Sequence, residues 1–123
     1  MATFKKLTVY DSTHIYAIAS DDTLYMYNGT TWSQLDTTSL DDIDVAKDGT
    51  LFGIESSGTT LLQWTGSVWS SSLGTQTIKK IAAKLSNNVY AIGTDEAIYQ
   101  WNGAYWSLNS AEAIITDLAI SKI

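Results

Sequence analysis

The chain has 123 residues, a net charge of −6 and no Cys. This length suits one domain with a modest core, the lack of Cys excludes disulfides and thiolate chemistry, and a hydrophobic content of 45 % excludes a disordered chain. All seven basic residues are Lys. Because Arg usually carries bidentate phosphate and base contacts, nucleic acid is not expected as a partner. No apolar run approaches the ~20 residues of a membrane span, so none is expected.

The pattern aromatic, any residue, Gly, two variable residues, Trp, Ser occurs three times, at 27–33, 64–70 and 101–107. The Trp residues of the pattern, Trp32, Trp69 and Trp106, are each 37 residues apart. A period of this size indicates one supersecondary unit that is used several times.

Each repeat predicts four short strands, because segments rich in Val, Ile, Leu, Tyr and Trp alternate with Gly, Asn, Asp and Ser. The expected strands begin and end close to 4–9, 15–18, 24–27 and 32–35 in the first repeat, 40–45, 51–54, 61–64 and 69–73 in the second, and 78–83, 89–92, 98–101 and 106–108 in the third. The Asn-Gly or Thr-Gly of the motif predicts a tight hairpin turn between the third and fourth strands.

The repeats divide a single domain, residues 1–123, into the units 4–39, 40–77 and 78–113, followed by a tail strand at 114–123. Residues 115–120 of this tail match the opening of a fourth repeat. Four-stranded units of roughly 40 residues predict an all-β fold of propeller blades. A β-trefoil, with three repeats of four strands closed within one chain, is the alternative.

The succession of Ile or Leu, Tyr, any residue, Tyr or Trp, and then Asn-Gly-X-X-Trp resembles the tectonin repeat, as in tachylectin-2-type β-propeller lectins. The resemblance covers residues 4–120. It implies a sugar-binding propeller with pockets between neighbouring blades. The chain departs from the family in two respects. Such propellers close with five or more blades, and Tyr10, Ala46 and Lys84 stand where the first strand usually ends in Gly.

Candidate carbohydrate-binding residues lie in the three hairpins: Trp32, Trp69, Trp106, Tyr105, Asn28 and Asn102. The recurrence of the Trp residues also favours blade-to-blade packing. Tyr105 is more informative, because Thr31 and Val68 hold its place in the other repeats.

Catalytic, metal and cofactor sites are not expected. His14 is the only His in the chain, so a nucleophilic triad lacks its base and a metal site lacks convergent ligands. The up-and-down order of a blade places ten of the thirteen acids at one end of the molecule, at Asp21, Asp22, Asp36, Asp41, Asp42, Glu55, Asp95, Glu96, Glu112 and Asp117. The hairpin end is then close to neutral, which suits a neutral sugar.

Propellers have about 4–8 blades, so three blades predict a homo-oligomer, with two copies giving six. Lys5-Lys6, Asp41-Asp42, Lys79-Lys80 and Thr116-Asp117 occupy equivalent positions and alternate in charge. The alternation continues from copy to copy if the tail strand lies between them. The function that follows from the resemblance is a lectin-like, non-catalytic module with a glycan ligand. The alternative is a structural or interaction subunit of a larger assembly, such as a virion component.

Overall fold

A computed structural model describes residues 3–110, which form eleven β-strands and no helix. The strands are β1 (Phe4–Asp11), β2 (His14–Ala19), β3 (Leu24–Tyr27), β4 (Trp32–Asp36), β5 (Leu40–Val45), β6 (Leu51–Glu55), β7 (Leu61–Gln63), β8 (Ile78–Leu85), β9 (Asn88–Gly93), β10 (Ile98–Trp101) and β11 (Trp106–Ser110). They pair in chain order into three antiparallel sheets, β1–β4, β5–β7 and β8–β11. The prediction of an all-β fold is confirmed.

The three sheets have the same register. Leu7 on β1 is opposite Ala17, Ile43 on β5 is opposite Gly53, and Ile81 on β8 is opposite Ala91. Each of these three strands also has a register shift close to its start. The sheets are therefore successive copies of one structural unit, and we refer to them as blades 1, 2 and 3.

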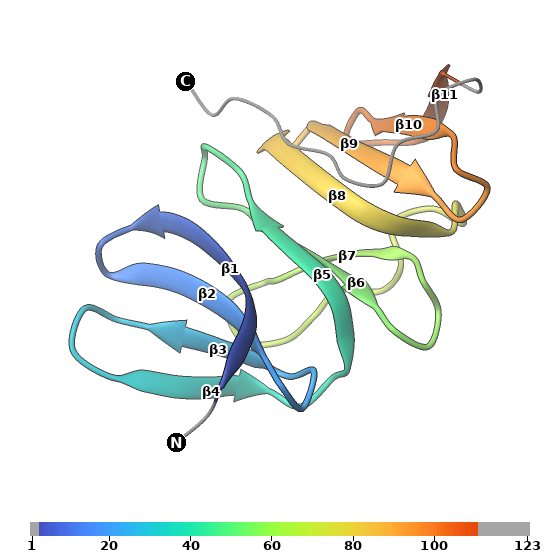
Figure 1. Cartoon of the computed structure of the whole chain (residues 1–123). Coiled ribbons are helices and arrows are strands. Elements are labelled where there is room, and N and C mark those ends of the chain that lie inside the picture. The colour runs from blue at the N-terminus through green and yellow to red at the C-terminus, as the bar shows by residue number, and fades with distance from the viewer. Residues whose placement is uncertain (1–2, 111–123) are drawn as a thin grey trace.

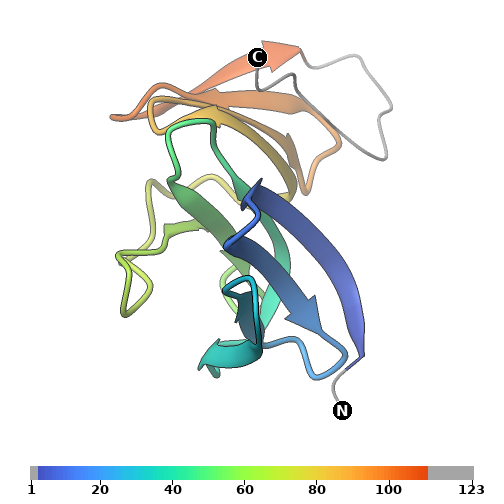
Figure 2. The ribbon, with the colours of Figure 1, turned by 90° about the vertical axis from the view of Figure 1, so that its left-hand side faces the viewer.

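The blades are stacked face to face, with β1, β5 and β8 side by side at their inner edges (Figure 1). Seen from the side, they fan from the N-terminal to the C-terminal sheet (Figure 2). One apolar core lies between blades 1 and 2 and a second between blades 2 and 3. Separate sheets that each pair only with themselves form a propeller arrangement, so the β-trefoil alternative is wrong.

The fourth strand predicted for the second repeat is not formed. It is reduced to a single bridge between Trp64 and Trp69, and blade 2 has three strands. The hydroxyl of Ser70 accepts a bond from the backbone N–H of Gln63 at 3.0 Å and donates to the carbonyl of Ser71 at 2.8 Å. Serine side chains that bond nearby backbone groups compete with a sheet ladder. The chain from Ser70 onward consequently runs as a loop.

Carboxylates of β5 connect blade 2 to both of its neighbours. Asp42 Oδ1 lies 3.0 Å from Lys6 Nζ of blade 1, and its Oδ2 accepts a 2.9 Å bond from the N–H of Ile81 in blade 3. Asp44 accepts from the hydroxyl of Thr8 at 2.9 Å and from the N–H of Ala83 at 2.7 Å. These contacts set the position of each inner strand along its neighbour.

Asp42 does not contribute to an exposed acidic surface at the predicted end, because it is only 1 % exposed. Its pairing with Lys6 and with a backbone N–H explains how a carboxylate is tolerated there. Two exposed acids of that end, Asp22 and Glu96, pair with Lys5 and Lys79. The tail strand predicted at 114–123, with Asp117, lies outside the described residues, as does Glu112.

Candidate functional site: a pocket between blades 2 and 3

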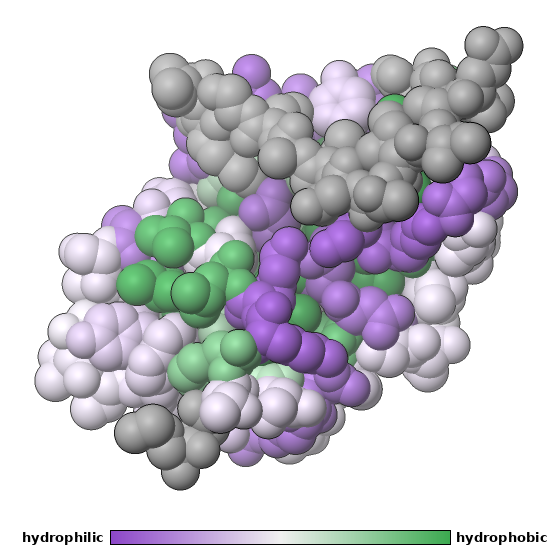
Figure 3. Space-filling view, viewed as in Figure 1, coloured by the Kyte–Doolittle hydropathy of each residue, from purple (hydrophilic) through white to green (hydrophobic). Residues whose placement is uncertain are grey.

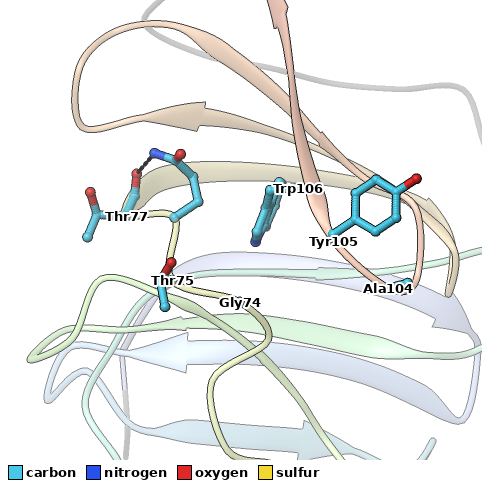
Figure 4. A pocket seen from close by; sticks show the side chains of 7 residues that line it. Gly74, Thr75, Thr77, Ala104, Tyr105 and Trp106 are labelled. Carbon is cyan, nitrogen blue, oxygen red and sulfur yellow. Dashed lines mark hydrogen bonds between the residues drawn. The ribbon is translucent and has the colours of Figure 1, made fainter.

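A pocket of about 440 Å³ lies between the loop that follows blade 2 and the hairpin of blade 3 (Figure 4). The loop contributes Gly74, Thr75, Gln76 and Thr77, and the hairpin between β10 and β11 contributes Ala104, Tyr105 and Trp106. None of these side chains is charged. The pocket therefore offers two aromatic rings, the hydroxyls of two Thr and one Tyr, and an amide to a ligand.

The indole of Trp106 is held between the two walls. Its Nε1 donates a 2.9 Å hydrogen bond to the carbonyl of Leu73, and the ring lies 5.5 Å from that of Trp101. Gly74 makes this position available, because a Cβ at Gly74 would lie 2.7 Å from Trp106 Cδ1. Gly74 also has a φ of +77°, which disfavours any side chain there. The Trp106 N–H is consequently engaged within the protein, while the ring borders the pocket.

Trp69 occupies the same place in the repeat but points elsewhere. It lies over Gly53 of its own sheet, where a Cβ would come within 2.7 Å of Trp69 Cη2. Blade 3 has Ala91 at the position of Gly53. Trp106 lies against Gly74 instead. Trp106 is also partly buried against the core between blades 2 and 3.

Tyr105 is the most exposed large hydrophobic side chain in the described part of the chain, at 65 %. Its backbone N–H donates to Asn102 Oδ1 at 2.9 Å, and the N–H of Ala104 donates to the same oxygen. The turn of this hairpin is completed by Gly103, whose φ is +97°. The ring of Tyr105 is therefore carried by a well-bonded turn beside the pocket.

The other predicted site residues lie apart from this pocket. Asn28 Oδ1 accepts from the N–H groups of Thr30 and Thr31, both at 2.9 Å, as Asn102 does in its own hairpin. Trp32 packs against Phe4 with ring centroids 4.4 Å apart. Trp69 packs against the core between blades 1 and 2. The structure thus gives turn-forming roles to Asn28 and Asn102 and packing roles to Trp32 and Trp69.

A hydrogen-bonded network supports the polar wall. Gln76 Nε2 donates to the carbonyl of Thr77 at 3.1 Å, and the hydroxyls of Thr77 and Thr94 lie 2.8 Å apart. Behind them, the Tyr99 hydroxyl donates to Asp95 Oδ2 at 2.5 Å. This bond lowers the pKa of the Asp95 carboxyl and raises the pKa of the Tyr99 hydroxyl, so both groups keep their charge states over a wide pH range.

The loop half of the pocket, residues 74–77, was not expected from the sequence. One signal could have indicated it: Leu73 follows Trp69 by four residues, whereas Leu35 follows Trp32 by three. The extra residue lies in the segment that fails to form a fourth strand. Within residues 3–110, no three His, Asp or Glu side chains gather in a way that could hold a metal ion, and no helix is long and apolar enough to cross a membrane.

Antiparallel blades stacked on a common row of inner strands define a β-propeller module. The chain belongs to the Tectonin domain family, whose family model matches residues 4–113. Ten chains of solved structures match the fold. One of them, described as "YCF48 bound to D1 peptide", superposes with a TM-score of 0.69 over 86 % of this chain at 20 % sequence identity. This chain spans 39 % of that one, and the likeness supports the fold alone. No curated protein matches the chain.

Proposed function

We propose that the chain is a non-catalytic, carbohydrate-binding propeller module whose site is the pocket between blades 2 and 3. One observation carries the proposal: aromatic rings and neutral polar groups converge on a pocket between two blades of a Tectonin domain. Sugar rings have apolar faces and peripheral hydroxyls. They are therefore bound by aromatic planes together with a few well-placed hydrogen-bonding groups.

The residues of the pocket divide between these two tasks. The face of Tyr105, which is largely exposed, is available to stack on a sugar ring, and Trp106 forms the adjoining apolar wall. Thr75, Gln76 and Thr77 line the opposite side and supply hydroxyl and amide groups. Because the lining has no charged side chain, we expect neutral glycans to be preferred over sialylated or sulfated ones. Binding of this kind needs no metal ion or cofactor.

A glycan array tests the proposal. We expect the assembled protein to bind a set of neutral glycans, and we expect Tyr105→Ala to lose most of that signal. Val68→Ala is the matched control, since Val68 holds the equivalent hairpin position in blade 2 and is also exposed. An array with no bound glycan, or a Tyr105→Ala variant that binds as the parent does, would refute the proposal.

The second candidate function is a structural or interaction subunit, and the exposed inner strand of blade 1 favours it. Leu7 and Val9 on β1 are 55 % and 60 % exposed. Contiguous exposed apolar surface of this kind marks interaction sites. We propose that copies of the chain associate head to tail through this face, and that two copies give six blades. Light scattering tests the association, and a mass of one chain at micromolar concentration would contradict it.

A further inference from the structure

The inner strand of blade 1, β1, has an exposed apolar face, whereas the equivalent face is buried on β5 and β8. Residues equivalent to Leu7 are Ile43 and Ile81, which are 0 % and 3 % exposed. Residues equivalent to Val9 are Val45 and Ala83, both nearly inaccessible. The space-filling view shows an apolar patch over β1 and β2 at this place (Figure 3). In blades 2 and 3 the same face is covered by the inner strand of the preceding blade.

Contacts between neighbouring inner strands follow one rule. Polar side chains of one inner strand accept hydrogen bonds from backbone N–H groups of the inner strand in the next blade. The residues that donate these bonds carry the apolar side chains of that next strand. The N–H of Val45 donates to Thr8 Oγ1 at 3.1 Å, and the N–H of Ala83 donates to Asp44 Oδ2 at 2.7 Å. Asp42 serves the N–H of Ile81 in the same way and pairs with Lys6 of the blade before it.

By the shared register, the N–H groups of Leu7 and Val9 point away from β2, toward the side where a neighbouring inner strand would supply such acceptors. A second copy's β8 does not provide them directly, because Lys80 and Ala82 stand at the positions of Asp42 and Asp44. That contact would also place the ammonium groups of Lys80 and Lys6 next to each other, which is unfavourable. The opening of the fourth repeat, residues 115–120, is different. Asp117 aligns with Asp42 and would supply a carboxylate for the Leu7 N–H, whereas Ala119 aligns with Asp44 and would supply no acceptor for Val9.

We propose that β1 is the docking site for residues 115–120 of a second copy, with Asp117 accepting a hydrogen bond from the Leu7 N–H. The inference rests on the association of copies proposed above and specifies its contact. Asp117 would stand between Lys80 of its own chain and β1 of the neighbour, as Asp42 stands between Lys6 and β8.

Cysteine pairing tests the contact directly, since the chain has no Cys of its own. Full-length Leu7→Cys and full-length Asp117→Cys are mixed and oxidised. Because each variant has a single Cys, every disulfide that forms must join two chains. Val68→Cys mixed with Asp117→Cys is the matched control, because Val68 is 57 % exposed, close to the 55 % of Leu7, but lies at a hairpin tip. We expect the Leu7 pair to form a disulfide at least tenfold faster than the Val68 pair.

A second measurement covers variants that fold poorly. Asp117→Lys in the otherwise unchanged chain should shift the light-scattering mass toward one chain, while Glu112→Lys, a substitution with the same change in charge, should leave it unchanged. Equal disulfide rates for Leu7 and Val68, or an unchanged mass for Asp117→Lys, would overturn the contact. If the contact is overturned and an oligomer is still present, the copies associate through another surface. Glycan binding that persists leaves the pocket proposal intact.

Discussion

The motif tryptophans Trp69 and Trp106 have the same place in the repeat but different hydrogen bonding. Trp106 Nε1 donates to the Leu73 carbonyl. Trp69 Nε1 is buried and has no partner among the described residues. A buried donor without an acceptor costs free energy, whereas a satisfied one contributes about 1 kcal/mol. The two indoles therefore contribute differently to stability although their sequence motifs are almost the same.

Replacing each Trp by Phe should separate the two cases. Trp106→Phe removes ring area and a hydrogen bond and leaves the Leu73 carbonyl without its donor. Trp69→Phe removes ring area and an unsatisfied donor. We expect Trp106→Phe to lower the free energy of unfolding by about 1–2 kcal/mol more than Trp69→Phe does. Urea unfolding of both variants measures the difference, and a larger loss for Trp69→Phe would contradict the assignment.

At the scale of elements, β5 is the connecting strand, because its carboxylates bond to blades 1 and 3. Removing the Asp42 side chain takes the acceptor from Lys6 and from the N–H of Ile81. Hydrogen bonds to charged groups contribute about 1.5–3 kcal/mol, so we expect Asp42→Ala to lower the free energy of unfolding by about 2–3 kcal/mol.

The adjacent residue provides the control for Asp42→Ala. Asp41 is exposed and bonds only to the hydroxyl of Ser56 among the described contacts. We expect Asp41→Ala to cost less than about 1 kcal/mol. Chemical denaturation followed by circular dichroism compares the two. Similar losses at both positions would show that the bridging role of Asp42 adds nothing.

Asp48 lies at the contact between blades 2 and 3, where its carboxylate accepts a hydrogen bond from the N–H of Ser86. Partial burial raises the pKa of its carboxyl, but hydrogen bonds from the N–H groups of Ser86 and Thr50 outweigh this effect, and the net pKa lies below the ordinary 3.8. A carboxyl whose pKa is lowered on folding contributes stability that is complete above its unfolded pKa. That stability is lost as the pH falls through the folded pKa.

We therefore expect the melting temperature to be steady down to about pH 4 and to fall below it. Asp48→Asn keeps one acceptor oxygen but cannot titrate. It should melt at a lower temperature at neutral pH and show a smaller fall between about pH 4 and pH 2. Asp11, Asp21 and Asp95 also have lowered pKa values, so part of the acid dependence should remain. An unchanged acid dependence in Asp48→Asn would argue against this role.

The sequence predicts most elements because period and turn chemistry act locally. The strands of blades 1 and 3 and the hairpins at Gly29 and Gly103 agree with the alternation of residues. The fourth strand of blade 2 could not be predicted, since it depends on whether the Ser70 hydroxyl takes the backbone N–H of Gln63 on β7. The hairpin side of the pocket was also predictable, because Tyr105 is aromatic whereas the equivalent residues of the other repeats, Thr31 and Val68, are not. The other half depends on the contact of Gly74 with Trp106, which only the fold brings together.

At the scale of the whole molecule, the uncharged pocket and the exposed apolar face of β1 lie on different parts of the stack of blades. The pocket lies between blades 2 and 3, beside the hairpin of blade 3. The open strand is β1, at the other side of the stack (Figure 1). Because the two surfaces share no residue, glycan binding and association of copies can be tested independently.

The most direct test of the central claim is to locate where a neutral glycan binds. The array ligand with the strongest signal is titrated into ¹⁵N-labelled full-length protein, and amide chemical shifts are followed. We predict that the largest changes occur at residues 74–77 and 104–106, with little change in the hairpins at 28–31 and 65–68. Changes confined to those other hairpins, or none at a saturating concentration of the glycan, would contradict the claim.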